Sequence, residues 1–142
     1  TSNDIFITGS SGNVGIGTTS PGEKLEVAGN ISTSGVFIGQ TLLSSSKNTD
    51  VDTGTETIAS LATGSYDAAF FDYVAKNGTN LRAGTITAVH NASTVQFNEV
   101  STVDIGDTEG VKFAVVETGG SLALQATVTS NNWDIKTLIR GL

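Results

Sequence analysis

The sequence contains no cysteine, so disulfide bonds cannot stabilise the fold, and cysteine usage indicates nothing about the redox compartment. It also contains a single histidine, His90. A catalytic triad or a histidine-rich metal site would therefore depend on that one side chain. His90 stands beside Asn91 at the end of a predicted strand, where we expect an ordinary surface or hydrogen-bonding role. The sequence thus favours a protein that is not an enzyme and has no cofactor or metal.

Positive charge is also scarce. Seven Lys and Arg residues stand against 14 Asp and Glu residues, and the formal net charge is −7. The seven cations are scattered singly along the chain, without a basic stripe. Proteins that bind nucleic acid or an anionic membrane surface need clustered cations. Both classes are therefore disfavoured, and we expect the excess of acidic residues mainly to favour solubility.

Long apolar runs are missing as well. No stretch approaches the roughly 20 residues that a membrane-spanning helix requires. The sequence begins Thr1-Ser2-Asn3-Asp4, without a basic stretch or the apolar core of a signal peptide. We therefore expect a protein that is made in the cytoplasm and is not inserted into a membrane.

The residues that are abundant point to β-structure. The chain has 17 glycines, only 15% charged residues and 37% hydrophobic residues, with many Ser, Thr and Asn. This composition is too apolar and too weakly charged for a disordered chain. Glycine together with Thr and Val favours strands joined by tight turns. The predicted fold class is all-β.

Residues 57–142 show dense strand patterns separated by turn signals. Alternation of apolar and polar residues is clear at 111–115, at 122–128 and at 133–140. Gly119-Gly120, between two of these runs, is the strongest hairpin signal in the chain. About seven short antiparallel strands with this pattern predict a β-sandwich or jelly roll. The predicted strands are Thr57–Leu61, Ala68–Lys76, Leu81–Val89, Thr94–Val103, Val111–Glu117, Leu122–Thr129 and Trp133–Arg140.

A short helix is the alternative for residues 68–76, because Phe70, Phe71, Tyr73 and Val74 form a stripe at helical spacing. The β-branched and aromatic content favours a strand instead. Most aromatic side chains alternate along predicted strands, so we expect core burial for Phe70, Phe71, Tyr73, Phe97, Phe113 and Trp133. Tyr66, which follows Gly64-Ser65, is the aromatic residue that we expect to be exposed.

The stretch Gly12–Ser32, GNVGIGTTSPGEKLEVAGNIS, differs from the rest of the chain. Its apolar residues alternate with small or polar ones, and Pro21-Gly22 predicts a reversal between two short strands. A two-stranded hairpin has too little apolar surface to be stable alone in water. We therefore predict that identical chains cover its apolar side chains. The trimer-core candidates are Val14, Ile16, Leu25, Val27 and Ile31.

The run VGIGTTSPGEKLEVAGNI within this stretch closely resembles a segment that recurs in fibre and tail proteins of tailed bacteriophages. In those proteins the segment commonly forms part of an intertwined trimeric β-rich stem. The resemblance implies a virion protein made of three identical chains, and it covers residues 12–32 only. Such segments often precede a self-cleaving chaperone domain. This chain has no recognisable version of that domain, so self-cleavage is not implied.

Composition also predicts the domain organisation. Residues 1–46 carry short apolar runs at intervals, typical of a β-rich stem and trimerisation segment. Residues 47–56 are polar and are predicted to form a connector. Residues 57–142 are predicted to form the sandwich domain.

Acidic residues offer two weaker candidates for chemistry. Asp50, Asp52 and Glu56 form one acidic group, and Asp104, Asp107 and Glu109 form another; a weak calcium site at either is an alternative to a solvated loop. Paired carboxylates for glycoside hydrolysis would have to be Asp67 with Asp72, or Glu99 with Asp104. Spacing along the chain does not show the required separation, and we discount this chemistry.

Three functions remain in view. The first is a homotrimeric virion fibre or tail protein that contributes to host attachment, bound to other virion proteins and to a host-surface glycan or protein. The second is a trimer that decorates the capsid. The third is a small enzyme or a monomeric sugar-binding module. We expect residues at turns to make surface contacts: Tyr66, Asn77, Asn80, Asn91, Asn131 and Asn132.

Overall fold

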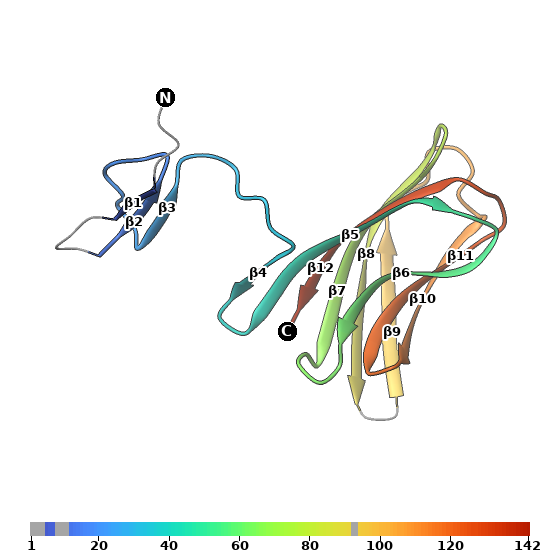
Figure 1. Cartoon of the computed structure of the whole chain (residues 1–142). Coiled ribbons are helices and arrows are strands. Elements are labelled where there is room, and N and C mark those ends of the chain that lie inside the picture. The colour runs from blue at the N-terminus through green and yellow to red at the C-terminus, as the bar shows by residue number, and fades with distance from the viewer. Residues whose placement is uncertain (1–4, 8–11, 92–93) are drawn as a thin grey trace. The chain divides into compact units, whose positions relative to one another are not determined.

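The structure is a computed structural model, and it describes residues 5–7, 12–91 and 94–142. The chain divides into two compact units, Thr1–Thr33 and Ser34–Leu142. The described residues form twelve strands and no helix (Figure 1), so the predicted all-β class is confirmed.

The first unit is a small sheet of three short strands. β1 (Ile5–Ile7) pairs antiparallel with β2 (Val14–Ile16), and β2 pairs parallel with β3 (Leu25–Val27). The prediction that Pro21-Gly22 reverses the chain between two paired strands is therefore wrong. The segment between β2 and β3 instead brings the chain back to the N-terminal end of β2, so that β3 runs in the same direction. Two hydrogen bonds of 2.9 Å show this: Val14 N–H donates to the Lys24 carbonyl, and Ala28 N–H donates to the Ile16 carbonyl.

Gly15 explains how so short a connection can close. Its backbone is buried, and a Cβ at this position would collide with the carbonyl oxygen of Thr18. Gly17, with φ of 74°, starts the connection in a backbone conformation that favours glycine. The glycines of this segment therefore permit a close return of the chain rather than a hairpin.

The second unit contains a six-stranded sheet and a three-stranded sheet (Figure 1). The larger has the order β4-β5-β12-β7-β8-β9, and every adjacent pair is antiparallel. Its strands are β4 (Gly35–Ile38), β5 (Thr41–Val51), β12 (Trp133–Gly141), β7 (Ala68–Asn77), β8 (Asn80–Asn91) and β9 (Thr94–Ser101). The smaller sheet has the order β10-β11-β6 and comprises β10 (Val111–Thr118), β11 (Ser121–Val128) and β6 (Gly54–Ala62).

One hydrophobic core joins the two sheets. Alternate residues of β7, β10 and β12 point into it, as the period-two burial along these strands shows. The largest fully buried side chains are Trp133, Phe71, Ile86, Leu122 and Leu124. The seven strands predicted between residues 57 and 142 are all present, and the helical alternative for residues 68–76 is wrong, because that segment is β7.

Three expectations about aromatic side chains are corrected. Phe70 is only half-buried, because it lies on the face of β7 opposite to the core, where the Arg140 guanidinium lies over its ring. Phe97 is 43% exposed, since β9 is an edge strand with little to cover it. Tyr66, expected at the surface, is partly buried and packs against the core. Its ring lies over Gly141, where an added Cβ would approach Tyr66 Cδ1 to 2.9 Å. Phe71, Tyr73, Phe113 and Trp133 are buried as predicted.

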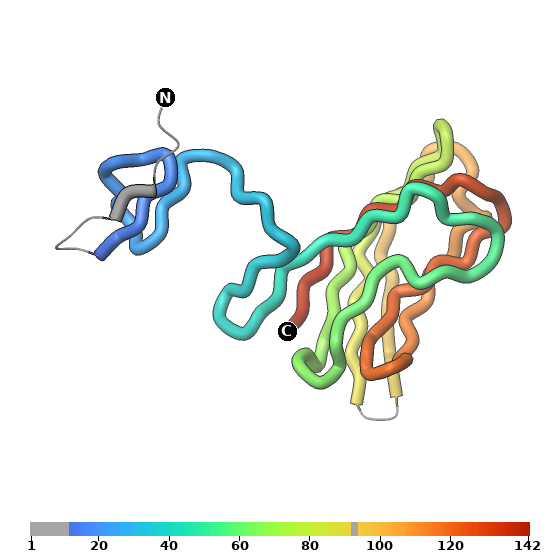
Figure 2. The backbone as a smooth tube through the Cα atoms, in the orientation of Figure 1, coloured from blue at the N-terminus to red at the C-terminus, as the bar shows by residue number. Residues whose placement is uncertain are grey.

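The predicted connector at residues 47–56 is also corrected. Residues 47–51 belong to β5 in the large sheet, and residues 54–56 belong to β6 in the small sheet. The turn at Asp52-Thr53 carries the chain from one sheet to the other (Figure 2). The segment is polar because its side chains are exposed or only half-buried, with Val51 as the buried exception. The boundary between compact units lies instead between Thr33 and Ser34.

Candidate interaction surfaces

The trimer-core candidates share one face of the small first sheet. Val14 is in register with Leu25, and Ile16 is in register with Val27. Residues two apart on a strand point to the same side, so these four side chains form one apolar face. Leu25 is 60% exposed and Ile16 is also exposed, whereas Val14 and Val27 are half-buried. Ile31, beyond β3, is 66% exposed.

Strand β4 adds apolar residues that were not among the candidates. Phe37 and Ile38 are each 69% exposed, and Val36 is exposed too. On one side β4 pairs with β5; its other edge has no strand partner among the described residues. The signal for this strand was present in the sequence as the apolar run Val36–Ile38 between two glycines. Six of the exposed large apolar side chains of the described residues therefore lie between residues 14 and 38: Ile16, Leu25, Ile31, Val36, Phe37 and Ile38.

Four of the asparagine candidates lie at one end of the sandwich. Asn77 Nδ2 donates to the Asn131 carbonyl at 3.0 Å, and Asn131 Oδ1 accepts from Thr53 N–H at 2.9 Å and from its hydroxyl at 2.7 Å. Asn80 Oδ1 accepts from Asp107 N–H at 3.0 Å, and Asn132 has φ of 68°. The side chains of Asn77, Asn80 and Asn131 hold the turns together, which is the ordinary role of asparagine in turns, and Asn132 adopts the left-handed backbone that asparagine tolerates.

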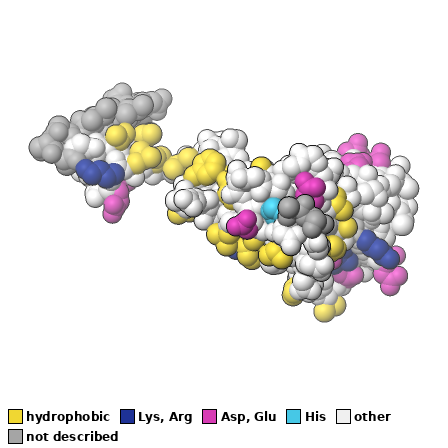
Figure 3. Space-filling view, turned by 90° about the horizontal axis from the view of Figure 1, so that it is seen from below, with side chains coloured by type: hydrophobic (Ala, Val, Ile, Leu, Met, Phe, Trp, Pro, Cys, Tyr) yellow, Lys and Arg dark blue, Asp and Glu magenta, His cyan; other side chains and the backbone are white. Residues whose placement is uncertain are grey.

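Asn91 and Tyr66 lie at the opposite end, so the structure does not bring the six candidates together. Here Thr63, Gly64, Asp67, His90, Asn91 and Glu117 line a pocket of about 490 Å³. His90 Nε2 lies 2.8 Å from the Tyr66 carbonyl oxygen. Figure 3 shows the histidine beside acidic side chains. Across the described ranges, no three His, Cys, Asp or Glu residues are grouped so that they could hold a metal ion.

The acidic candidates are occupied by hydrogen bonds. The Glu56 carboxylate accepts from Asp52 N–H at 3.3 Å and from Asn48 Nδ2 at 3.0 Å. The candidate pair Asp67 and Asp72 is not brought together. Asp67 lies in the bend before β7 and lines the pocket beside His90, whereas Asp72 lies within β7 and is bonded to Thr85 and Arg140.

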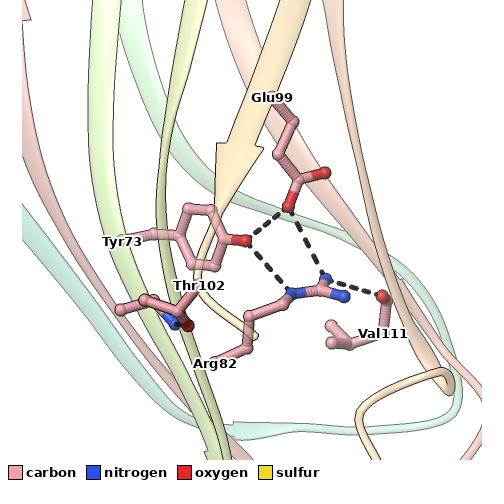
Figure 4. Close-up of polar contacts among 6 residues, drawn as sticks. Tyr73, Arg82, Glu99, Thr102 and Val111 are labelled. Atoms are coloured by element: carbon pink, nitrogen blue, oxygen red, sulfur yellow. Dashed lines mark hydrogen bonds and ion pairs between the residues drawn. The ribbon is translucent and has the colours of Figure 1, made fainter. Parts of the chain in front are cut away.

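Glu99, of the second candidate pair, belongs to an inward-facing polar network (Figure 4). The Tyr73 hydroxyl donates to Glu99, and Arg82 Nε donates to the Tyr73 hydroxyl oxygen at 3.1 Å. Arg82 Nη2 also donates to the Val111 carbonyl at 2.9 Å and lies 3.7 Å from Glu99. Burial, and then the hydrogen bond to Glu99, raise the pKa of Tyr73 above its ordinary value. The network links β7, β8 and β9 to β10.

A groove of about 850 Å³ crosses the outer face of the six-stranded sheet, the face that points away from the core. Two adjacent rows of side chains line it; the first crosses four strands and ends at Thr102, just beyond β9, and the second crosses five strands. One row is Lys47, Lys136, Val74, Ala83 and Thr102. The other is Ser45, Leu138, Asp72, Thr85 and Val100. We call it the outer-face groove.

Asp72 is neutralised within this groove. Arg140 Nη2 lies 3.2 Å from Asp72 Oδ2, the Thr85 hydroxyl donates to Asp72 Oδ1 at 2.7 Å, and the Arg140 guanidinium stacks over Phe70, 4.9 Å from its ring centre. Lys47 and Lys136 stand directly opposite each other on β5 and β12. Lys136 lies 4.0 Å from Asp134, and Lys47 has no ion-pair partner among the described residues.

In the part of the chain that the structure describes, no helix has the length and apolarity needed to cross a bilayer. Comparisons with protein-family models, with curated proteins and with solved structures give no match. The assignment of function therefore depends on the surfaces described above.

Proposed function

We propose that this chain is a non-enzymatic structural protein of a bacteriophage virion, a homotrimeric fibre or tail protein that contributes to attachment to the host surface. The observation that carries the proposal is the series of exposed apolar side chains from Ile16 to Ile38. The resemblance of residues 12–32 to phage stem segments supports it.

The physical argument begins with the size of the first unit. Each of its strands has three residues, and its apolar face is open to solvent. Sheets this small lack the buried apolar area needed to offset the entropy of ordering their residues. Covering Leu25, Ile31 and their neighbours would supply about 25 cal/mol for each Å² removed from water. Three copies of one segment can provide this cover to one another.

Strand β4 supports the same conclusion. An unpaired strand edge with exposed apolar residues is a site for pairing with another chain, and soluble proteins usually protect such edges with charges, proline or bulges. β4 is short, at four residues, but its sequence Gly-Val-Phe-Ile has no charge or proline and its pairing with β5 has no bulge. We place β4 at the junction between the trimeric stem and the head.

The molar mass in solution tests the proposal. We expect three times the chain mass of 14.5 kDa by light scattering. The variant Ile16→Ser/Leu25→Ser/Ile31→Ser is expected to be monomeric, because its apolar contacts are lost, while the sandwich stays folded. Val103→Ser is the matched control, since Val103 is 93% exposed but lies outside the segment. A monomeric wild-type protein at high concentration would contradict the proposal.

Electron microscopy of labelled particles would separate the two virion locations. Label at the tail supports the fibre role, whereas label spread over the shell supports capsid decoration by the same trimer.

A further inference from the structure

We infer that the outer-face groove binds an acidic saccharide, through Lys47 and Lys136 acting on a single carboxylate or phosphate group. This inference deepens the attachment role proposed above and depends on that proposal only for its biological meaning. Its evidence is the groove itself.

The first step concerns charge. Like charges placed directly opposite on neighbouring strands destabilise a sheet. Lys47 and Lys136 occupy such a pair, with Val74 rather than an acid on the far side of Lys136. The nearby Asp72 is already neutralised by Arg140. An anion held between the two ammonium groups would remove the repulsion, and both lysines have long stems that can converge on it.

The second step concerns the balance of the whole surface. The chain has a net charge of −7, yet the groove keeps an excess of positive charge. Asp72 cancels Arg140 and Asp134 lies 4.0 Å from Lys136, whereas Lys47 has no ion-pair partner among the described residues. The paired lysines are therefore a local exception on an acidic protein. An anionic membrane would be repelled by the negative charge on the rest of the protein, and this repulsion disfavours a bilayer as the partner.

The third step concerns the rest of the lining. Four of the strands beneath the groove, β5, β12, β7 and β8, are hydrogen-bonded on both sides, so this part of its floor offers no free backbone groups to which an extended peptide could add as a strand. It offers the hydroxyls of Ser45 and Thr102 and the small apolar surfaces of Val74 and Ala83. Hydroxyl donors beside apolar patches suit a sugar ring, which has polar edges and apolar faces.

The two rows contain no aromatic side chain on which a ring could stack. A neutral sugar would therefore bind weakly in this groove. The contact between the two lysines and the anionic group must orient the ligand and supply much of the affinity. Charge-assisted hydrogen bonds are the stronger kind, each worth about 1.5 to 3 kcal/mol in general, or roughly tenfold or more in affinity.

Calorimetric titration of the full chain tests this inference. The probes are tetragalacturonate, its fully methyl-esterified form, a maltotetraose that carries one phosphate group and a poly-glutamate peptide. We expect the tetragalacturonate or the phosphorylated maltotetraose to bind, and the stronger of the two identifies a carboxylate or a phosphate source. The neutral ester is expected not to bind, and binding should weaken as salt is added.

The variants are matched in charge. Lys47→Gln and Lys136→Gln are each expected to weaken binding by about tenfold. Lys112→Gln, on β10 in the other sheet, removes the same charge and is expected to have no effect. Glutamine keeps most of the stem, and the loss of repulsion leaves the sheet folded.

The inference is overturned by any of three results: no probe binds, the ester binds as well as the acid, or the lysine variants bind like wild type. Equal binding of poly-glutamate would also overturn it, by showing a site for acidic polymers in general. Light scattering on the same samples keeps the two proposals apart, because a monomer that binds tetragalacturonate would contradict the trimer alone.

Discussion

At the scale of single residues, Tyr73 shows how the interior accepts polar groups. Its ring tilts against Phe113 with centres 4.4 Å apart, and its hydroxyl joins Arg82 and Glu99. Gly84 makes room for it, since a Cβ there would lie 2.6 Å from the Val100 carbonyl oxygen and 2.9 Å from the Tyr73 hydroxyl. A buried network of this kind is stable only when its members are satisfied together.

Tyr73 is expected to make stability depend on pH in the alkaline range. Its folded-state pKa is raised above the unfolded value of about 10, chiefly by burial, so the folded state retains a proton that the unfolded state releases. The contribution is fully present below pH 10 and is lost as the pH rises above it.

Denaturant unfolding at a series of pH values between 8 and about 11 checks this expectation. Wild type is expected to lose stability above pH 10 more steeply than Tyr73→Phe, whose ring keeps the packing but has no hydroxyl to titrate. Tyr66→Phe is the control and is expected to follow wild type. Equal slopes for wild type and Tyr73→Phe would show that the network does not retain the proton.

At the scale of elements, the β10–β11 hairpin is determined by two glycines. Thr118 pairs with Ser121, so Gly119 and Gly120 form a two-residue loop, and their φ angles are 58° and 76°. Positive φ at both central residues is the type I′ arrangement that matches the twist of the strands.

Substitution at Gly119 is expected to follow this backbone requirement. Gly119→Asn should leave the free energy of unfolding within about 0.5 kcal/mol, because asparagine tolerates left-handed backbone. Gly119→Val should cost about 1 to 3 kcal/mol, because a β-branched residue does not. Space is not the issue, since nothing lies within 4 Å of a Cβ at this position. Similar losses in both variants would contradict the turn assignment.

At the scale of the whole molecule, the two units bury very different amounts of apolar surface. The sandwich has a continuous core that includes Trp133, Phe71 and Leu124. The first unit exposes the side chains that would form its core. The stability of the sandwich is therefore expected to be a property of one chain, and the stability of the first unit a property of the assembly.

Thermal scans at several protein concentrations check this difference. The transition reported by Trp133 fluorescence, in the sandwich, is expected not to depend on concentration. A separate transition of the first unit is expected to move to higher temperature as concentration rises, since association stabilises only the folded assembly. Ile16→Ser/Leu25→Ser/Ile31→Ser should remove the concentration dependence. A first unit that melts independently of concentration would show that it is stable in isolation.

Much of the fold was predictable because its signals are local. Alternation along residues 111–128 and 133–140 determines which side chains are buried, and Gly119-Gly120 determines the hairpin. Each of these signals lies within about ten residues. Two strands that follow each other in the chain, such as β10 and β11, pair through the turn between them, so their pairing can be predicted from the local sequence. The helical alternative at residues 68–76 failed because burial alternates strictly along β7.

The remaining features depend on pairings between distant residues. The sequence of residues 47–56 is polar, yet Lys47 belongs to the large sheet because β5 pairs with β12, almost 90 residues later. The parallel pairing of β2 with β3 depends on the close return at Gly15, which Pro21-Gly22 does not reveal. The sequence alone thus determined the strands, their buried faces and the surplus of exposed apolar residues near the N-terminus. Tertiary structure alone decided that Lys47 and Lys136 face each other across the outer-face groove, because strand order and register are set by the packing of the whole sheet and not by any one segment.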